Sequence, residues 1–123
     1  MSRGLGDVYK RQGWNFAPEL ENVMADTEPE VCHIVDKPTF GSYMLPSEIL
    51  DELMAHNKAV EDIEKIVIYG YCTDICVISN AMVLRAAFPE TEIEVLSDCC
   101  AGVTPQSHQT ALDAMRACQF TII

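Results

Sequence analysis

One stretch limits the possible folds more than any other: KIVIYGYCTDICVISNAMVLRAAF, residues 65–88. Its first part, residues 65–71, is a continuous apolar run, which is typical of a parallel strand covered on both faces. Its second part, residues 74–88, is apolar nearly all round and predicts a buried helix. The sequence therefore places Cys76 where a buried strand passes into a buried helix.

The rest of the chain alternates in the same way. Ser47 is a plausible helix cap, and Thr104 followed by Pro105 is a cap with proline in the first turn. Strands separated by helices predict one α/β domain with three layers: a mostly parallel, Rossmann-like sheet and helices on both faces. Further strands are predicted at residues 29–37, 92–98 and 120–123, and further helices at 13–24, 46–57 and 104–118.

Composition narrows the classes of partner. The chain has 123 residues, with 8 basic and 19 acidic side chains and a net charge of −11. Such a surface repels phosphate backbones and anionic lipid, so neither nucleic acid nor membrane is an expected partner. No apolar run approaches the roughly 20 residues of a spanning helix, and no signal peptide is visible. A cytoplasmic protein acting on a small molecule is expected.

The cysteines and histidines do not predict a metal site. The six cysteines are irregularly spaced, without paired CxxC blocks, so no metal is expected in this chain and the thiols should be reduced. Three of them are interpreted as small buried hydrophobes: Cys32, Cys99 and Cys118. The histidines show no metal-binding spacing and are interpreted as structural or exposed: His33, His56 and His108.

Reactive groups come directly after three of the predicted strands, where ligands bind in open parallel sheets. Lys37 ends the first predicted strand, and Cys72 and Cys76 come after the second. The third strand ends with Asp98, Cys99 and Cys100, to which the sequence assigns no specific role. Each group would lie at the same edge of the sheet. This edge is therefore the predicted position of the functional site.

Cys76 is the strongest candidate for chemistry. Unpaired N–H groups and the helix dipole at the first turn favour a thiolate, the form that attacks a carbonyl carbon. The same N–H groups could hold the resulting oxyanion. A lysine such as Lys37 could steady both anions, and Asp74 is expected to cap the turn. The alternatives are a core cysteine and a surface lysine that extends to solvent.

The first twelve residues, MSRGLGDVYKRQ, do not match the rest of the chain. They resemble a translated sequencing-adaptor remnant, as found at the ends of gene fragments assembled from environmental DNA. The alternative is an ordinary disordered terminus. Residues 1–12 are therefore interpreted as a non-native or disordered leader, and residues 13–123 as the C-terminal part of one domain.

Three blocks in the correct order carry a resemblance to a known family: DKPTFGSYMLPSEILDELM, IVIYGYCTDICVISNAMVLRAAFP and VLSDCCAGVTPQSHQTALDAM. The chain resembles the isochorismatase-like cysteine hydrolases, especially the nicotinamidase-like amidohydrolases, from about Gly13 onward. The resemblance implies that Cys76 is the nucleophile and Lys37 a catalytic lysine. It also implies a cis peptide at Tyr71–Cys72, an oxyanion hole formed by the N–H groups of Cys72 and Cys76, and substrate contacts from Phe40 and Tyr71.

The sequence also departs from the family. The family's catalytic aspartate lies in an Asp-x-Gln-like stretch near the N-terminus, which is absent here, and Asp26 and Asp36 stand in the wrong context to replace it. An early central strand is missing as well. The chain is therefore expected to be an N-terminally truncated fragment with little or no activity of its own.

The resemblance implies that the intact parent hydrolyses a small amide, with nicotinamide as the first guess, through a thioester. The resemblance also implies a homo-oligomer for that parent, which could bind a divalent metal as well. Alternatives are a family member acting on an N-carbamoyl or ureido substrate or on isochorismate, a non-catalytic relative, and a thiol-redox protein using Cys72 and Cys76.

Overall fold

The computed structural model describes residues 16–27 and 32–123. The chain divides into two units, residues 1–39 and 40–123, and each is described by itself. In the first unit, the helix predicted over residues 13–24 is α2 (Pro18–Ala25), and it begins at a proline, whose fixed φ suits a first helical turn. Residues 32–37 form no strand, so the strand predicted over 29–37 is wrong for its described part. A short apolar stretch becomes a strand only when it pairs with a neighbouring strand. The predicted leader, residues 1–12, lies outside the described residues.

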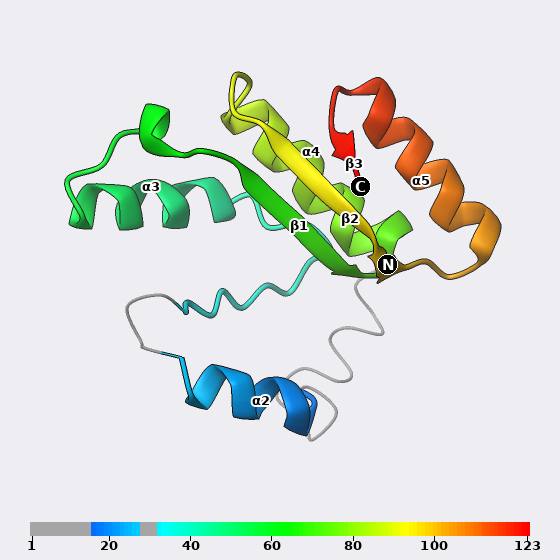
Figure 1. Ribbon diagram of the computed structural model, residues 1–123, viewed down its shortest axis with the longest axis horizontal. Helices are drawn as coiled ribbons and strands as arrows, with labels where there is room; N and C mark the ends of the chain where they lie inside the picture. The colour runs from blue at the N-terminus through cyan, green and yellow to red at the C-terminus, as the bar shows by residue number, and fades with distance from the viewer. Residues whose placement is uncertain (1–15, 28–31) are drawn as a thin grey trace. The chain divides into compact units, whose positions relative to one another are not determined.

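The second unit is a parallel α/β structure, which confirms the predicted α/β class and parallel sheet, although its described helices do not cover both faces of that sheet as predicted (Figure 1). Its three strands lie in the order β1-β2-β3, and every neighbouring pair is parallel. A helical segment separates each strand from the next. In chain order the elements are α3 (Leu45–Ala55), η2 (Val60–Asp62), β1 (Ile66–Tyr71), η3 (Thr73–Val77), α4 (Ile78–Ala87), β2 (Ile93–Ala101), α5 (Pro105–Ala117) and β3 (Thr121–Ile122).

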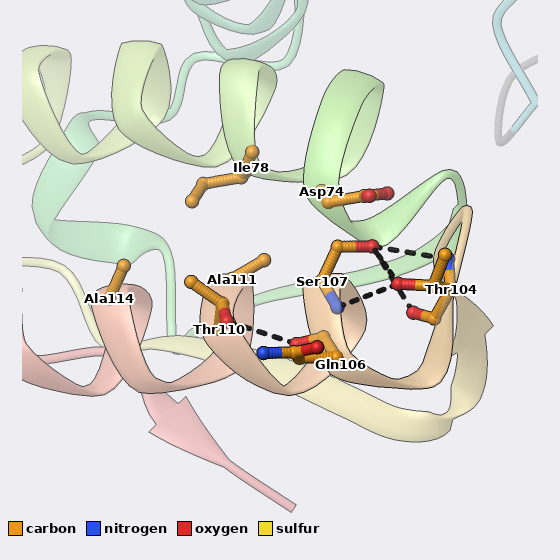
Figure 2. Close-up of a pocket in the computed structure, with 8 residues that line it drawn as sticks. All are labelled: Asp74, Ile78, Thr104, Gln106, Ser107, Thr110, Ala111 and Ala114. Atoms are coloured by element: carbon orange, nitrogen blue, oxygen red, sulfur yellow. Dashed lines mark hydrogen bonds between the residues drawn. The ribbon is translucent and has the colours of Figure 1, made fainter.

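The starts of α5 and α3 differ in how well the sequence predicts them. Thr104 caps α5 as predicted: the Ser107 amide donates to the Thr104 hydroxyl at 3.0 Å, and the Thr104 amide donates to the Ser107 hydroxyl at 3.1 Å (Figure 2). Helix α3 instead begins at Leu45 with Pro46 in its first turn and no side-chain cap, so Ser47 is not a cap. The fixed φ of proline suits a first helical turn, which moves the helix start ahead of the serine.

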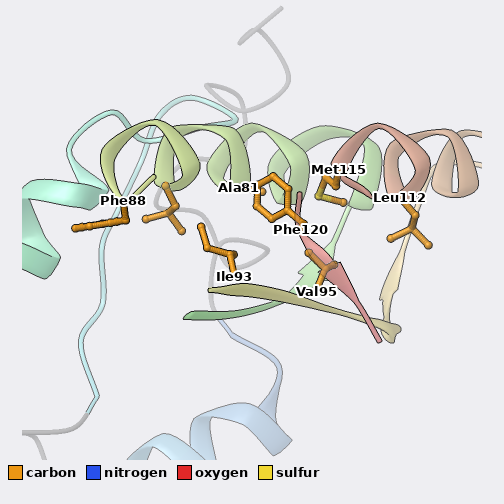
Figure 3. Packing of buried hydrophobic residues seen from close by; sticks show 8 residues of the cluster. Ala81, Phe88, Ile93, Val95, Leu112, Met115 and Phe120 are labelled. Atoms are coloured by element: carbon orange, nitrogen blue, oxygen red, sulfur yellow. The ribbon is translucent and has the colours of Figure 1, made fainter. Parts of the chain in front are cut away.

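The core lies between the sheet and the helices α4 and α5, which pack on the same face of it (Figure 3). Phe88 and Met115 are almost completely buried, as are Ile93 and Val95 on β2. Burying such side chains contributes about 1.5–3 kcal/mol each. The cluster consists of Ala81, Leu84, Phe88, Ile93, Val95, Leu112, Met115 and Phe120.

The other face of β1 is open, which corrects the prediction that residues 65–71 are covered on both faces. Burial alternates along the strand, and Val67, Tyr69 and Tyr71 are 40%, 66% and 80% exposed. An apolar run cannot by itself distinguish a strand covered on two faces from one covered on a single face, because the burial depends on what packs against it.

A side-chain hydrogen bond connects the turn after β1 to the first turn of α5. Thr73 is completely buried, and its hydroxyl lies 2.8 Å from Nδ1 of His108. His108 in turn packs closely against Gly102, where an added Cβ would lie 2.8 Å from that of His108. His108 is thus structural, one of the two roles expected for it.

Asp74 also joins the turn to this region. Its carboxylate accepts a hydrogen bond from the Val103 amide at 3.2 Å, so it bridges to another loop as well as lying in its own first turn. The Ser107 side chain, and then the Val103 amide, hold the pKa of Asp74 below its ordinary value against the opposing effect of desolvation. The expectation that Asp74 caps its own turn is wrong: Cys72 is the N-cap position of η3, no side chain caps it, and the Asp74 carboxylate bonds the more distant Val103 amide.

Replacing Thr73 by valine should destabilise the protein by about 1–3 kcal/mol, because it leaves His108 without its buried hydroxyl partner. The matched control is Thr110→Val on the exposed side of α5, where the hydroxyl only bonds the carbonyl of Gln106 and the change should cost less than about 0.5 kcal/mol. Urea unfolding measures both free energies. Equal losses for the two variants would contradict a special role for the Thr73–His108 pair.

Candidate functional site

Cys76 lies in η3, at the carboxyl end of β1 and directly before α4. The segment Thr73–Val77 is a π-helix, and the Cys72 carbonyl accepts hydrogen bonds from the amides of Ile75 at 3.0 Å and Val77 at 3.1 Å. The thiol-bearing residue is half-buried. Single π-helical turns occur frequently at functional sites, so the observed element suits the predicted position of Cys76.

The backbone just before this turn is unusual. The peptide bond between Tyr71 and Cys72 is cis, at the position that the family resemblance implies. Gly70 has a φ of +132°, a backbone conformation that residues other than glycine rarely adopt. The pairing register of β1 with β2 shifts just before this glycine. The sequence signal for this irregularity is the glycine that interrupts the apolar run.

A loop from 40 residues earlier in the chain reaches the helix that begins just after Cys76. The Asn80 side chain donates to the carbonyls of Phe40 at 3.2 Å and Cys76 at 2.9 Å, and it accepts from the Ser42 amide at 2.8 Å. Sequence reasoning missed Asn80. The signal for it was an amide side chain in an otherwise apolar helix, one turn after the candidate nucleophile.

The predicted site residues fall in both units. Cys72 and Cys76 are half-buried in the second unit, which also contains Phe40, half-buried, and Tyr71, exposed. Lys37 belongs to the first unit, where it is half-buried and its Nζ donates to the Thr39 carbonyl at 2.9 Å. The second unit thus carries the predicted nucleophile, both predicted oxyanion donors and both predicted substrate contacts.

All six cysteines are free thiols. Cys99 and Cys118 are exposed, so the interpretation of these two as buried hydrophobes is wrong, while Cys32 is half-buried. Cys99 lies near the end of β2, and Cys118 comes directly after α5, where element ends leave side chains accessible. Burial raises the pKa of the Cys100 thiol, although a hydrogen bond with the Gly70 backbone opposes this.

A groove of about 540 Å³ lies beside the turn, between η3, α4 and α5 (Figure 2). Neither Cys76 nor Phe40 nor Tyr71 lines it, so the groove is separate from the predicted nucleophile. Its lining combines one carboxylate with hydroxyl, amide and small apolar side chains: Asp74, Ile78, Thr104, Gln106, Ser107, Thr110, Ala111 and Ala114.

Residues 16–27 and 32–123 contain no group of three or more His, Cys, Asp or Glu side chains that could hold a metal ion. Within the same ranges, no helix combines the length and apolar character that crossing a membrane requires.

Solved structures share this fold. A nicotinamidase from Bacillus subtilis superimposes with a TM-score of 0.74 at 16% identity, covering 93% of this chain and 60% of its own. A pyrazinamidase/nicotinamidase from Streptococcus mutans has a TM-score of 0.69 and 22% sequence identity, and the match covers 94% of this chain and 60% of that one. A nicotinamidase from Staphylococcus aureus has a TM-score of 0.65 and 21% identity, and the match covers 88% of this chain and 65% of that one. This chain thus spans about 60–65% of the length of these relatives.

Sequence comparison gives the family directly. No curated protein matches the chain significantly. The profile of the Isochorismatase domain, however, matches residues 9–123, which is most of the chain and includes the strand, turn and helix around Cys76. The resemblance seen in the sequence and the parallel α/β fold agree with that match. The chain belongs to the isochorismatase family of hydrolases.

Proposed function

We propose that the intact protein hydrolyses a small planar amide through Cys76, with nicotinamide as the first substrate to test. The observation that carries the proposal is the position of Cys76 in a π-helical turn at the carboxyl end of β1, directly before α4. Membership of the isochorismatase family supports hydrolysis. The names of the structural relatives make nicotinamide the natural first choice.

In the proposed reaction, the Cys76 sulfur attacks the amide carbon after losing its proton to an aspartate. The backbone N–H groups of Cys72 and Cys76 hold the oxyanion, and the Lys37 ammonium assists. The C–N bond then breaks, and the nitrogen takes up the proton and leaves as ammonia. Water attacks the thioester and releases the carboxylic acid and the free thiol. Phe40 and Tyr71 offer flat surfaces on either side of a ring.

The aspartate of this scheme comes from the family resemblance, and the sequence holds no Asp-x-Gln-like stretch to supply it. The 123-residue chain alone should therefore hydrolyse nicotinamide poorly. Sequencing the source DNA upstream of the Gly13 codon, on an independent clone, identifies any further coding sequence. The longest chain that this DNA encodes is the one to use for kinetics.

Cys76→Ala should lower ammonia release from nicotinamide by at least about a thousandfold, because the thioester cannot form. Cys118→Ala, at an exposed cysteine after α5, is the matched control and should retain full activity. A coupled assay for ammonia measures both. Undiminished hydrolysis by Cys76→Ala would remove the nucleophile assignment, and a panel with N-carbamoyl, ureido and isochorismate substrates would then show which bond is broken.

Lys37→Ala should lower kcat/KM by about a hundredfold, since the tetrahedral anion loses a cationic partner. Lys58→Ala changes an exposed lysine after α3 and serves as the control for loss of one positive charge. Steady-state kinetics on nicotinamide compares the two variants. An unchanged kcat/KM for Lys37→Ala would leave the lysine with a surface role only.

The rival thiol-redox function predicts that mild oxidation removes two thiols at Cys72 and Cys76, whereas hydrolysis requires no disulfide. Alkylation followed by peptide mass spectrometry counts them. The same alkylation tests Cys100: because burial raises the pKa of this thiol, its thiolate fraction stays small at neutral pH. Iodoacetamide labelling of Cys100 should therefore be slow at neutral pH and speed up as the pH is raised. A labelling rate for Cys100 that does not change with pH would contradict the raised pKa.

A further inference from the structure

Asn80 joins two parts of the second unit through one side chain. It lies on α4, one helical turn after Cys76, and its amide contacts three backbone groups. The nitrogen donates to the carbonyls of Cys76 at 2.9 Å and Phe40 at 3.2 Å, and the oxygen accepts from the Ser42 amide at 2.8 Å. Two of these partners lie 38 and 40 residues earlier in the chain.

Only a carboxamide of this length satisfies all three groups. Two carbonyls need a donor and the Ser42 amide needs an acceptor, which also fixes the orientation of the Asn80 amide. Aspartate would lack the donors, and alanine would lack every contact. Asparagine has a low helix propensity, so its presence on α4 is explained by these three hydrogen bonds.

The loop packs on α4 at a second point beside Asn80. A Cβ added to Gly41 would lie 3.0 Å from Cβ of Ser79 and 3.3 Å from its carbonyl carbon, so the backbone of the loop approaches the helix closely. Ser42 is buried as well. Hydrogen bonding and packing thus hold the same three residues, Phe40 to Ser42, against the same turn of α4.

We propose that Asn80 is a positioning residue that sets the distance between Phe40 and the turn bearing Cys76. The proposal rests on the proposed function, in which Phe40 supports the ring of a planar amide and Cys76 attacks its carbonyl. The hydrogen bonds of the Asn80 side chain all go to backbone groups. Asn80 acts by fixing the backbone of both residues, so that a ring bound over Phe40 presents its amide carbon at a constant separation from the sulfur.

The first test uses no enzyme activity and asks whether Asn80 holds the loop of residues 40–42 against α4. In Asn80→Ala, hydrogen exchange of the Ser42 amide should speed up about tenfold or more, because its acceptor is gone. Alanine favours helix, so α4 should remain folded, and exchange at the Phe88 amide, which bonds the Leu84 carbonyl, should stay constant. Asn22→Ala, on the exposed α2, is the matched control. Unchanged exchange at Ser42 would show that Asn80 does not hold the loop and would overturn the proposal.

If Asn80→Ala proves too unstable to study, Gly41→Ala tests the same contact from the loop side. Its Cβ would press on Ser79, so Ser42 exchange should rise while that of Phe88 stays constant. NMR-detected exchange in the 123-residue chain serves for both variants. An unaltered exchange rate of the Ser42 amide in Gly41→Ala would likewise count against the proposal.

The second test is a double-mutant cycle on nicotinamide hydrolysis in the longest encoded chain. Phe40→Ala and Asn80→Ala should each raise KM about tenfold, with a smaller change in kcat, and the double variant should be no worse than Phe40→Ala alone. Independent, multiplying effects would overturn the positioning role even if Ser42 exchange responds. Failure of the proposed function shows separately, as hydrolysis that survives Cys76→Ala.

Discussion

The hydrogen bond between Thr73 and His108 is the interaction on which the turn depends. Thr73 comes directly after Cys72 and precedes Cys76 by three residues, and its hydroxyl is completely buried. A buried hydroxyl without a partner costs about 1–3 kcal/mol, so the backbone around it is confined to positions from which it reaches His108. The Gly102 backbone packs against His108 and leaves no space for a side chain, which limits how far the imidazole can shift.

Asn80 supplies the corresponding restraint from α4. The segments that hold the Cys76 turn thus come from residues 40–42 on one side of the sequence and residues 102–108 on the other. Neither set of contacts is local. A thiol at the end of a parallel strand needs such support, because the strand itself fixes only the direction from which the chain enters the turn. Preorganised backbone donors stabilise an oxyanion only when their positions are fixed before the substrate arrives.

The sequence predicted those elements whose signals are local. The Thr104 cap with Pro105, the proline at the start of α2 and the glycine between the two apolar stretches of β1 and α4 all report on their immediate neighbours. Predictions failed where a distant partner decides. The strand over 29–37 required a neighbouring strand, and the covering of β1 depended on what packs on its outer face.

The site showed the same division. The position of Cys76 could be predicted, because a continuous apolar run ends at a glycine just before it and a second apolar stretch of helical length follows. Asn80 and His108 could not, since the partners that they hold lie 35 to 40 residues away along the chain and no period connects them. Hydrogen bonds between a side chain and a distant group leave no trace in the sequence pattern, except a polar residue that is out of place in an apolar helix.

The arrangement also separates the reaction from the choice of substrate. Attack by a thiolate and an oxyanion held by backbone N–H groups would serve any carbonyl, so an amide and a ureido substrate make the same demands on the Cys76 turn. A vinyl ether has no carbonyl at its scissile bond and would not need a thioester. The flat ring of nicotinamide differs from a ureido chain in needing an apolar surface at a fixed height above the sulfur. In the proposed enzyme that surface would be the ring of Phe40, whose backbone carbonyl accepts a hydrogen bond from Asn80 on α4. Substrate choice in the proposed enzyme should therefore depend on the loop of residues 40–42 more than on the turn itself.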